Sequence, residues 1–336
     1  MPTAPLSRRS FLGGSTAAVG SLATVSTLAV PAAGFFTADD GGVLRVGVVG
    51  CGGRGTGAAA QAAAADPGVR ITVLADLFAD QIDSAVETLR RTAGRAFECP
   101  RERRFVGADA WRLAIESEID VVILATSPDV RPMQAAAAAA AGRHVFCEAP
   151  AAIDAAGVAT VLEASAHAAA RGRSFAAGLA WRHDPTTIRA IETIRSGAIG
   201  RPVAAVATSR IGLPWHRPVP AGQPLVAADH RNWITCTALS GGHLVEHMVH
   251  AIDKVLWAFG DEPPVRAEPR VADGRGGTGA RYVFADGRVI EAGIARRSGE
   301  RDRIEEWVRG THGSRSLRAA GAGRHARGMN AFVRSI

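Results

Sequence analysis

The stretch VLRVGVVGCGGRGTGAAAQAAAA, residues 43–65, decides the fold. Its opening residues are rich in valine, which is typical of a strand buried in a parallel sheet. The chain then passes through Gly50, Gly52 and Gly55, a GxGxxG spacing, into an alanine-rich helix predicted over 56–65. In such a loop the first glycine makes a tight turn, the second lets the backbone approach a pyrophosphate, and the third lets the helix pack on the strand. The helix N-terminus then faces the phosphate charge, so the stretch predicts a dinucleotide site. The loop residues expected to bind the cofactor are Gly50, Cys51, Gly52, Gly53, Arg54 and Gly55.

An aspartate stands where a dinucleotide site needs a ribose-binding acid. The run RITVLAD, residues 70–76, predicts the second strand, and Asp76 ends it about 20 residues beyond Gly55. An acid at this place favours the free 2′-hydroxyl of NAD. No arginine follows directly in Asp76-Leu77-Phe78, so NADP is the less favoured cofactor. Because the chain holds 38 glycines, a glycine-rich turn without a ligand is the alternative.

Helical and extended patterns alternate as far as residue 181. Helices are predicted over 78–93, 109–118, 131–142 and 151–171, and strands over 119–126, 144–147 and 174–181. Strands that alternate with helices indicate a doubly wound parallel sheet, whose ligands bind outside the carboxyl ends of the strands. The cofactor-binding residues expected at these ends are Thr126, Ser127, Pro128 and Glu148.

The second half of the chain predicts a different kind of sheet. Strands are expected over 201–211 and 305–309, and a hairpin over 281–294 has Asp-Gly at its turn. Trp215 and Trp233 lie in a long irregular segment between these strands. Such segments often line substrate sites, so the two tryptophans either line a site or fill space in an aromatic-poor core.

Charge and cysteine content exclude several classes of protein. The net charge is +7, but the basic residues are scattered and no stacking aromatics are interleaved with them, so nucleic-acid binding is not expected. Nearly all the positive charge is arginine, with Lys254 the single lysine. The four cysteines form no CxxC pair, which favours buried free thiols over a disulfide scaffold.

The N-terminus has the pattern of an export signal. The run SRRSFL, residues 7–12, precedes a weakly apolar stretch and then small residues, which predicts a twin-arginine signal peptide over 1–33. The expected location is therefore the periplasm or the cell envelope. Gly, Ser and Thr interrupt the apolar stretch, so no stable membrane span is expected after signal removal. A basic tail without a signal function is the alternative.

The stretch GGHLVEHMVHAID, residues 241–253, concentrates titratable side chains. On a helix, His243, Glu246, His247 and His250 share one face. His243 to His247 spells HxxEH, a zinc peptidase signature, but here it follows a dinucleotide domain, so no metal is predicted. A proton-transfer site and a polar helix face without chemistry are the other two interpretations.

A series of motifs resembles one known family. GVVGCGGRGTGAA, VLADLF, VVILATSPDVRP, GRHVFCEAP, GLAWRH and SGGHLVEHMVHAID occur in this order. The series is similar to the Gfo/Idh/MocA oxidoreductases, especially their exported twin-arginine members. The resemblance implies an NAD(P)-binding Rossmann domain, assigned to 42–182, and an α/β substrate domain with an open mixed sheet, assigned to 183–336. A homo-oligomer formed through that sheet is a further expectation.

The resemblance also implies an activity and its residues. The expected function is NAD(P)-dependent oxidation of a sugar, an inositol or a related polyol. The implied catalytic residues are His250 as acid/base, Asp253 three residues later and Glu246 one turn earlier. A histidine suits this role, since oxidation of an alcohol releases a proton together with a hydride. The alternatives are a catalytically impaired nucleotide-binding homologue, or an NAD-dependent glycosidase that uses transient oxidation.

Two features depart from the family pattern. The family commonly has Glu-Lys-Pro where this chain has Glu148-Ala149-Pro150, and that lysine usually contacts the substrate hydroxyl. Alanine can neither bind the hydroxyl nor support proton transfer. Family members also continue with further helices beyond the segment resembling residues 329–336, so a C-terminally shortened chain is expected.

Overall fold

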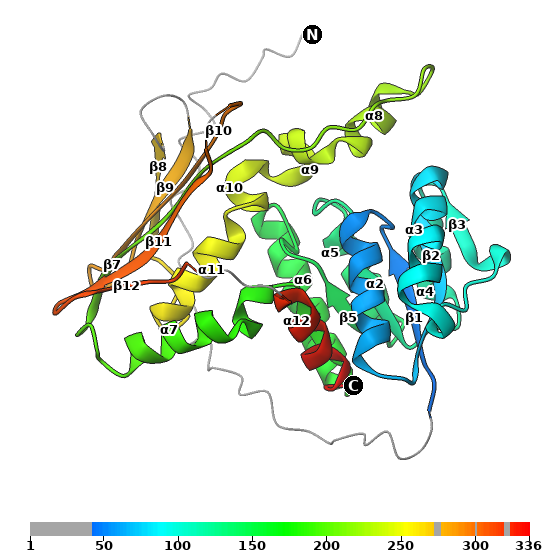
Figure 1. Ribbon diagram of the computed structural model, residues 1–336, viewed down its shortest axis with the longest axis horizontal. Helices are drawn as coiled ribbons and strands as arrows, with labels where there is room; N and C mark the ends of the chain where they lie inside the picture. The colour runs from blue at the N-terminus through cyan, green and yellow to red at the C-terminus, as the bar shows by residue number, and fades with distance from the viewer. Residues whose placement is uncertain (1–41, 272–276, 300, 319–322) are drawn as a thin grey trace, which may run out of the picture. The chain divides into compact units, whose positions relative to one another are not determined.

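The computed structural model describes residues 42–271, 277–299, 301–318 and 323–336 (Figure 1). These residues belong to one compact unit that contains two six-stranded sheets. The predicted signal, residues 1–33, lies outside the described residues. Among the described helices, none combines the length and the apolar character needed to cross a bilayer.

The first sheet is parallel throughout, with the strand order β3-β2-β1-β4-β5-β6. Its strands are β1 (Leu44–Val49), β2 (Val69–Asp76), β3 (Arg104–Val106), β4 (Val121–Leu124), β5 (His144–Cys147) and β6 (Phe175–Ala177). All four residues of β4 and of β5 are buried, as expected for strands covered on both faces. Strands β1 to β3 are added toward one edge of the sheet, and β4 to β6 toward the other. This order confirms the predicted doubly wound parallel sheet.

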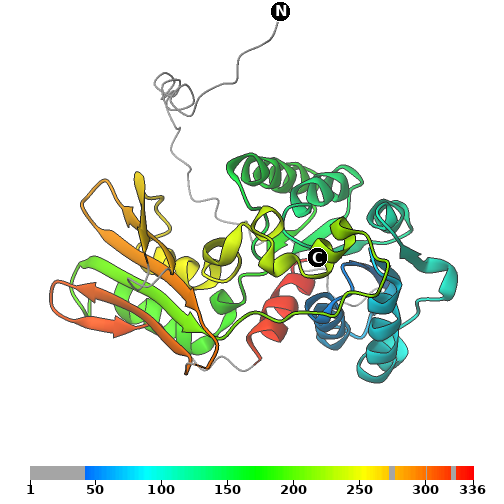
Figure 2. The same ribbon diagram turned by 90° about the horizontal axis from the view of Figure 1, so that it is seen from above.

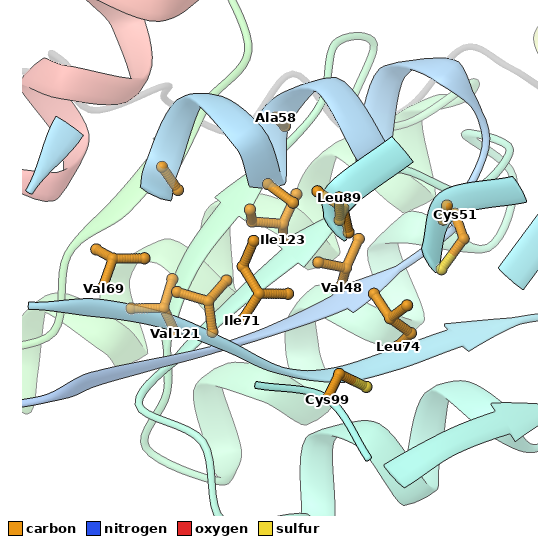
Figure 3. Packing of buried hydrophobic residues seen from close by; sticks show 14 of the residues in the cluster. Val48, Cys51, Ala58, Val69, Ile71, Leu74, Leu89, Cys99, Val121 and Ile123 are labelled. Carbon is orange, nitrogen blue, oxygen red and sulfur yellow. The ribbon is translucent and has the colours of Figure 1, made fainter. Parts of the chain in front are cut away.

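Helices cover both faces of the first sheet. They are α2 (Gly53–Ala65), α3 (Ala79–Thr92), α4 (Ala110–Glu116), α5 (Arg131–Ala140) and α6 (Ala155–Ala170). Helices α2 and α3 pack on one face, where Val48, Ile71 and Leu89 belong to a continuous apolar core (Figure 3). Helices α4, α5 and α6 cover the other face with small alanine side chains. The abundance of alanine therefore lets helices approach the sheet closely on both sides.

The last described helix, α12 (Arg324–Val333), packs against α2 beside the first sheet. Met329 and Phe332 are buried in the same core as α2 and α3, and the Phe332 ring lies 5.4 Å from that of Phe146. Burying an aromatic side chain of this kind contributes about 2 kcal/mol. The residues after the second sheet thus return to complete the core of the first.

The second sheet is mixed, with the strand order β12-β11-β7-β10-β9-β8. Its strands are β7 (Pro202–Ile211), β8 (Arg266–Val271), β9 (Thr278–Val283), β10 (Val289–Arg296), β11 (Arg303–Gly310) and β12 (Ser314–Ser316). Strands β7 and β10 run parallel, and the other neighbours pair antiparallel. The predicted hairpin is β9–β10, and Gly287 at its turn has a φ of 86°, which glycine adopts without strain. The mixed second sheet confirms the other half of the predicted fold class.

Two helices pack on one face of the second sheet (Figures 1 and 2). They are α7 (Pro185–Arg195) and α11 (Val249–Ala258). The sequence carries clear signals for the start of α7, because Asp184 caps the helix by accepting from the Thr187 N–H at 2.9 Å and proline follows at the first helical position. The Asp184 carboxylate also holds Arg327 of α12 at 2.9 Å.

Several predicted boundaries differ from the structure. The strand predicted over 174–181 ends at Ala177, and a 3₁₀ turn (Ala180–His183) follows after Gly178, which lies close against the Glu148 carboxylate. A Cβ on Gly178 would lie 2.5 Å from that carboxylate. The helix face predicted over 241–253 is divided between two helices, α10 (Gly242–Glu246) and α11. Three short elements precede α10: α8 (Leu225–Arg231), a 3₁₀ turn (Trp233–Thr235) and α9 (Thr237–Ser240).

Candidate active site

One cavity of about 1090 Å³ lies at the carboxyl ends of the first sheet's strands. Its walls come from the glycine-rich loop and from the residues that follow β2, β4 and β5. The second half of the chain completes it with residues of the 212–235 segment, the α10–α11 junction and α12. The cavity is therefore the place where the two halves of the chain contribute to a common site.

The glycine-rich loop has the geometry that a dinucleotide requires. Gly50 has a φ of 91°, and a Cβ there would lie 2.5 Å from the Ala125 backbone. A Cβ on Gly55 would lie 1.9 Å from the Gly50 carbonyl oxygen, so helix α2 contacts the loop backbone directly. Gly52 and Gly53 instead line the cavity; a Cβ on Gly53 would meet nothing, and one on Gly52 only the Gln81 side chain at 3.9 Å. No described side chain caps α2, which leaves its first N–H groups available to a phosphate.

Asp76 lines the cavity at the end of β2. Its carboxylate accepts from the Cys51 N–H at 2.6 Å and from the Phe78 N–H at 2.9 Å. Each oxygen keeps further lone pairs for a ribose hydroxyl. Burial raises the pKa of Asp76, against the opposing effect of these hydrogen bonds. The buried Cys51 side chain turns its thiol toward the Ala75 carbonyl, so Cys51 contributes through its backbone.

The ends of β4 and β5 meet the cavity beside the loop. Thr126, Ser127 and Glu148 line it, whereas Pro128 lies outside the lining. The buried Glu148 carboxylate accepts from Arg54 of the glycine-rich loop at 2.6 Å, which joins the loop to the end of β5. Because this ion pair is largely buried on the glutamate side, it fixes the cavity floor more firmly than a surface pair would.

A buried arginine that the sequence did not single out braces the same corner. Arg131, at the start of α5, donates to the carbonyl oxygens of Glu148 at 3.0 Å and Pro150 at 2.6 Å, and also to that of Thr126. These carbonyls belong to residues that follow β4 and β5, so one guanidinium fixes the positions of both turns relative to each other. An arginine directly before a proline at a predicted helix start is the local signal that marks it.

The histidine-rich stretch brings three side chains to the cavity. Glu246, His247 and His250 line it, whereas His243 lies outside the lining. Burial lowers the pKa of His250 to about 4, and repulsion from His247 adds to this shift. Burial also raises the pKa of Glu246, whose carboxylate lies 3.6 Å from Arg296. The imidazole of His250 is therefore neutral near pH 7, in the form that can accept a proton.

Asp253 occupies a different environment. It lies outside the cavity lining, and its carboxylate accepts from Arg182 Nε at 2.9 Å and Nη2 at 2.8 Å. The catalytic role predicted for Asp253 stays a prediction. A metal site is a separate matter: within the described residues, no group of three His, Cys, Asp or Glu side chains is arranged to hold a metal ion.

The cavity also receives residues that local patterns did not assign. His325 of α12 lines it, and burial lowers the pKa of His325 to about 4, with a contribution from Arg54. Trp215 and Trp233 line it as well, with ring centroids 6.2 Å apart in an edge-on arrangement. The structure thus places both tryptophans in the cavity wall, and Trp215 is 43% exposed, which is inconsistent with a core-filling role.

Comparison with known families gives two matches that together span most of the chain. Residues 44–176 match a family described as "Oxidoreductase family, NAD-binding Rossmann fold", named GFO_IDH_MocA. Residues 187–314 match the GFO/IDH/MocA C-terminal domain. The first match and the geometry of the glycine-rich loop confirm the predicted NAD cofactor.

Curated proteins and solved structures show the same likeness. An inositol 2-dehydrogenase of Acidothermus cellulolyticus is 30% identical over 46% of this chain, and inositol 2-dehydrogenase 2 of Saccharopolyspora erythraea is 29% identical over 65%. These alignments span 39% and 55% of the two relatives. A levoglucosan dehydrogenase in complex with NADH and levoglucosan is 25% identical, with a TM-score of 0.60 over 81% of this chain and 72% of that one. GenD2 from gentamicin A biosynthesis, in complex with NAD, shares the fold with a TM-score of 0.61 at 22% identity, over 82% and 72%.

Proposed function

Because the chain belongs to the Gfo/Idh/MocA oxidoreductase family, we propose that it oxidises a secondary hydroxyl group of a sugar, an inositol or a related polyol with NAD. One observation carries this proposal: a single cavity contains both the glycine-rich loop and the half-buried imidazole of His250. The relatives named as inositol and levoglucosan dehydrogenases support the substrate class.

The proposed division of labour follows from the cavity walls. NAD, when bound, supplies the acceptor for the hydride that leaves the substrate carbon. The backbone of Gly52 and Gly53 would hold its pyrophosphate, and Asp76 would hold a ribose hydroxyl. His250 accepts the hydroxyl proton at a ring nitrogen as the carbon is oxidised. Glu246 orients the substrate by accepting a hydrogen bond from a neighbouring hydroxyl group.

The direct test is a substrate panel. Purified full-length protein is supplied with NAD and a panel of inositols, sugar alcohols and sugars, and NADH absorbance is followed. We expect NADH to form with at least one polyol. Absence of turnover on every member would count against the proposal. A chromogenic glycoside, assayed without added cofactor, separates this activity from glycoside cleavage by transient oxidation.

The pH dependence should show the lowered pKa of His250. Alcohol oxidation needs the unprotonated imidazole, so kcat/KM should stay level from about pH 8 down to about pH 5 and fall as the pH approaches 4. An unperturbed histidine would instead give an inflection near about pH 6.5. The measurement is a pH profile of kcat/KM for the best panel substrate.

Stability must be followed in the same experiment. The pKa values of His144, His247 and His325 are also lowered to about 4, so the unfolded state binds more protons than the folded state below about pH 6.5. The free energy of unfolding therefore decreases as the pH falls from about 6.5 towards 4. Thermal unfolding at each pH separates this loss from protonation of the base.

A catalytically impaired homologue is the second candidate, and one observation favours it. Ala149 lines the cavity beside Glu148, at the place where the family pattern has a lysine that contacts the substrate hydroxyl. If this vacancy limits the reaction, Ala149→Lys should raise kcat by about tenfold or more, since a positioned acid/base group contributes 10²–10⁴-fold. The measurement is kcat on the panel. An unchanged or lower kcat, with NAD affinity retained, would mean that other groups already do the lysine's work.

We also propose that the chain is exported by the twin-arginine route to the periplasm or cell envelope. The run SRRSFL at residues 7–12 and the weakly apolar stretch after it support this location. Cell fractionation of the full-length chain tests it, and recovery of only unprocessed protein in the cytoplasm would contradict it.

A further inference from the structure

A segment of the second half of the chain is bound to the first sheet's helices by an ion pair. Residues 212–235 follow β7, and in Figure 2 this yellow-green segment extends from the second sheet toward the blue helices. Near its end, Arg231 donates to both carboxylate oxygens of Asp80, at 2.7 and 3.1 Å. Asp80 lies in the first turn of α3. The two partners are 151 residues apart in sequence, so the pair joins distant parts of the chain.

Further contacts fix the arginine at this position. Its guanidinium lies 4.1 Å from the centroid of the Phe78 ring, a cation–π contact, and its Nε donates to Gln223 at 3.2 Å. Arg231 is only 8% exposed although its partner Asp80 is on the surface. A second arginine, Arg217, donates to Gln81 of α3 at 2.9 Å. Two arginines of the segment therefore hold adjacent residues at the start of the same helix.

The segment is also braced internally. Asn232 is buried, and its side-chain amide accepts from the Arg217 N–H at 2.7 Å and donates to the Arg217 carbonyl at 3.0 Å. The rings of Trp215 and Trp233, next to this pair of hydrogen bonds in sequence, also meet edge-on. The outgoing and returning halves are thus tied together, and the segment forms a closed loop, which we call the strap (residues 212–235).

The strap lies opposite the part of the cavity that an adenosine would occupy. Its anchors on α3 follow directly after Asp76, the acid that would hold the adenosine ribose. Asp76, Phe78 and Trp111 line the cavity from the first sheet's side. Trp215 and Arg217 line it from the strap. A nucleotide held by Asp76 would therefore lie between these two walls.

We propose that the strap closes over the adenosine half of bound NAD and that the Arg231–Asp80 ion pair is its latch, so that the cofactor leaves the protein slowly. The proposal rests on NAD binding at the glycine-rich loop and is independent of the substrate and of the role of His250. The nucleotide cannot leave past β2 until Arg231 and Arg217 separate from α3. Release of NAD is then coupled to opening of the strap.

Asp80→Asn is the decisive variant, because two explanations of the strap predict opposite results. If Asp80 acted only through its charge, removing a carboxylate near an anionic dinucleotide would slow NAD release. If Asp80 is the latch partner, the variant loosens the strap, and the NADH dissociation rate constant should rise by about threefold, as expected for a partly exposed ion pair. Arg231→Gln also loses the contact with Phe78 and should raise that rate constant by about tenfold.

The measurement needs no turnover. Full-length protein loaded with NADH is mixed with excess NAD in a stopped-flow instrument, and the decay of tryptophan-sensitised NADH emission gives the dissociation rate constant. Asp83→Asn is the matched control, since it removes the same charge from an exposed position of α3 three residues further along the chain. High salt should speed release from the wild type but not from Asp80→Asn. Unchanged or slower release from Asp80→Asn, or equal acceleration in Asp83→Asn, would overturn the proposal.

Discussion

Gly55→Ala should greatly weaken NAD binding and lower the free energy of unfolding by about 3 kcal/mol. The new Cβ would lie 1.9 Å from the Gly50 carbonyl oxygen and 3.1 Å from the Ala125 side chain. The first of these atoms belongs to the backbone of the glycine-rich loop, so the contact can be relieved only by moving α2 away from β1. That movement separates the N-terminus of α2 from the pyrophosphate site, and NAD affinity should fall by about 100-fold or more.

The matched control is Gly57→Ala, in the same helix. A Cβ on Gly57 meets nothing nearer than the Arg54 guanidinium at 3.8 Å, an ordinary contact. Alanine is the better helix former, so this variant should be as stable as the wild type or more stable by about 0.5–1 kcal/mol. Thermal unfolding and calorimetric titration with NAD measure both properties. If Gly55→Ala bound NAD as tightly as Gly57→Ala, the close approach of helix and loop would not matter for the cofactor.

Local patterns predicted most strands and the glycine-rich loop of the cofactor half, but not the short strand β3 or the contacts of Arg131. The strands of a doubly wound sheet are short and continuously apolar, and β4 and β5 are buried at every position. Gly55 is required by a backbone contact with Gly50, only five residues away in sequence. Where the cause of a structure lies close by in sequence, a sequence pattern can predict it.

The histidine-rich stretch shows where periodicity fails. A 3.6-residue period places His243 with Glu246 and His250 on one continuous helix face, yet the chain forms two helices with a junction at His247 and Met248. The Met248 side chain is fully buried in the core of the second sheet. Packing against the second sheet determines the burial of Met248, and the spacing of the polar residues contains no information about that packing.

Contacts between distant segments were beyond sequence reasoning for a related reason. His325 reaches the cavity because α12 returns to the first sheet, and Arg231 reaches Asp80 because the strap crosses from the second half. Asp253 illustrates the converse. The family resemblance implies a role for Asp253 together with His250, and the structure shows its carboxylate bound by Arg182, 71 residues away. No local pattern contains the information that this arginine reaches the carboxylate.

His250→Gln should lower kcat for polyol oxidation by about 10²–10⁴-fold, because glutamine keeps a similar volume and polarity but cannot accept the hydroxyl proton. NAD affinity, measured by NADH fluorescence without substrate, should stay within about twofold of the wild type, since the cofactor is held by the glycine-rich loop and Asp76. His243→Gln is the matched control. It makes the same change in the same stretch, outside the cavity lining, and should leave kcat nearly unchanged.

A third variant, His325→Gln, tests the assignment of the base against the histidine of α12. His247, His250 and His325 all line the cavity, and the pKa of each is lowered to about 4, so residue type and electrostatics alone do not separate them. If His250 is the base, its replacement should remove both the activity and the acidic inflection of kcat/KM, whereas His325→Gln should keep the inflection with a kcat reduced by tenfold or less. The reverse result would assign proton transfer to α12, and would make His250 one of the polar groups that position the substrate.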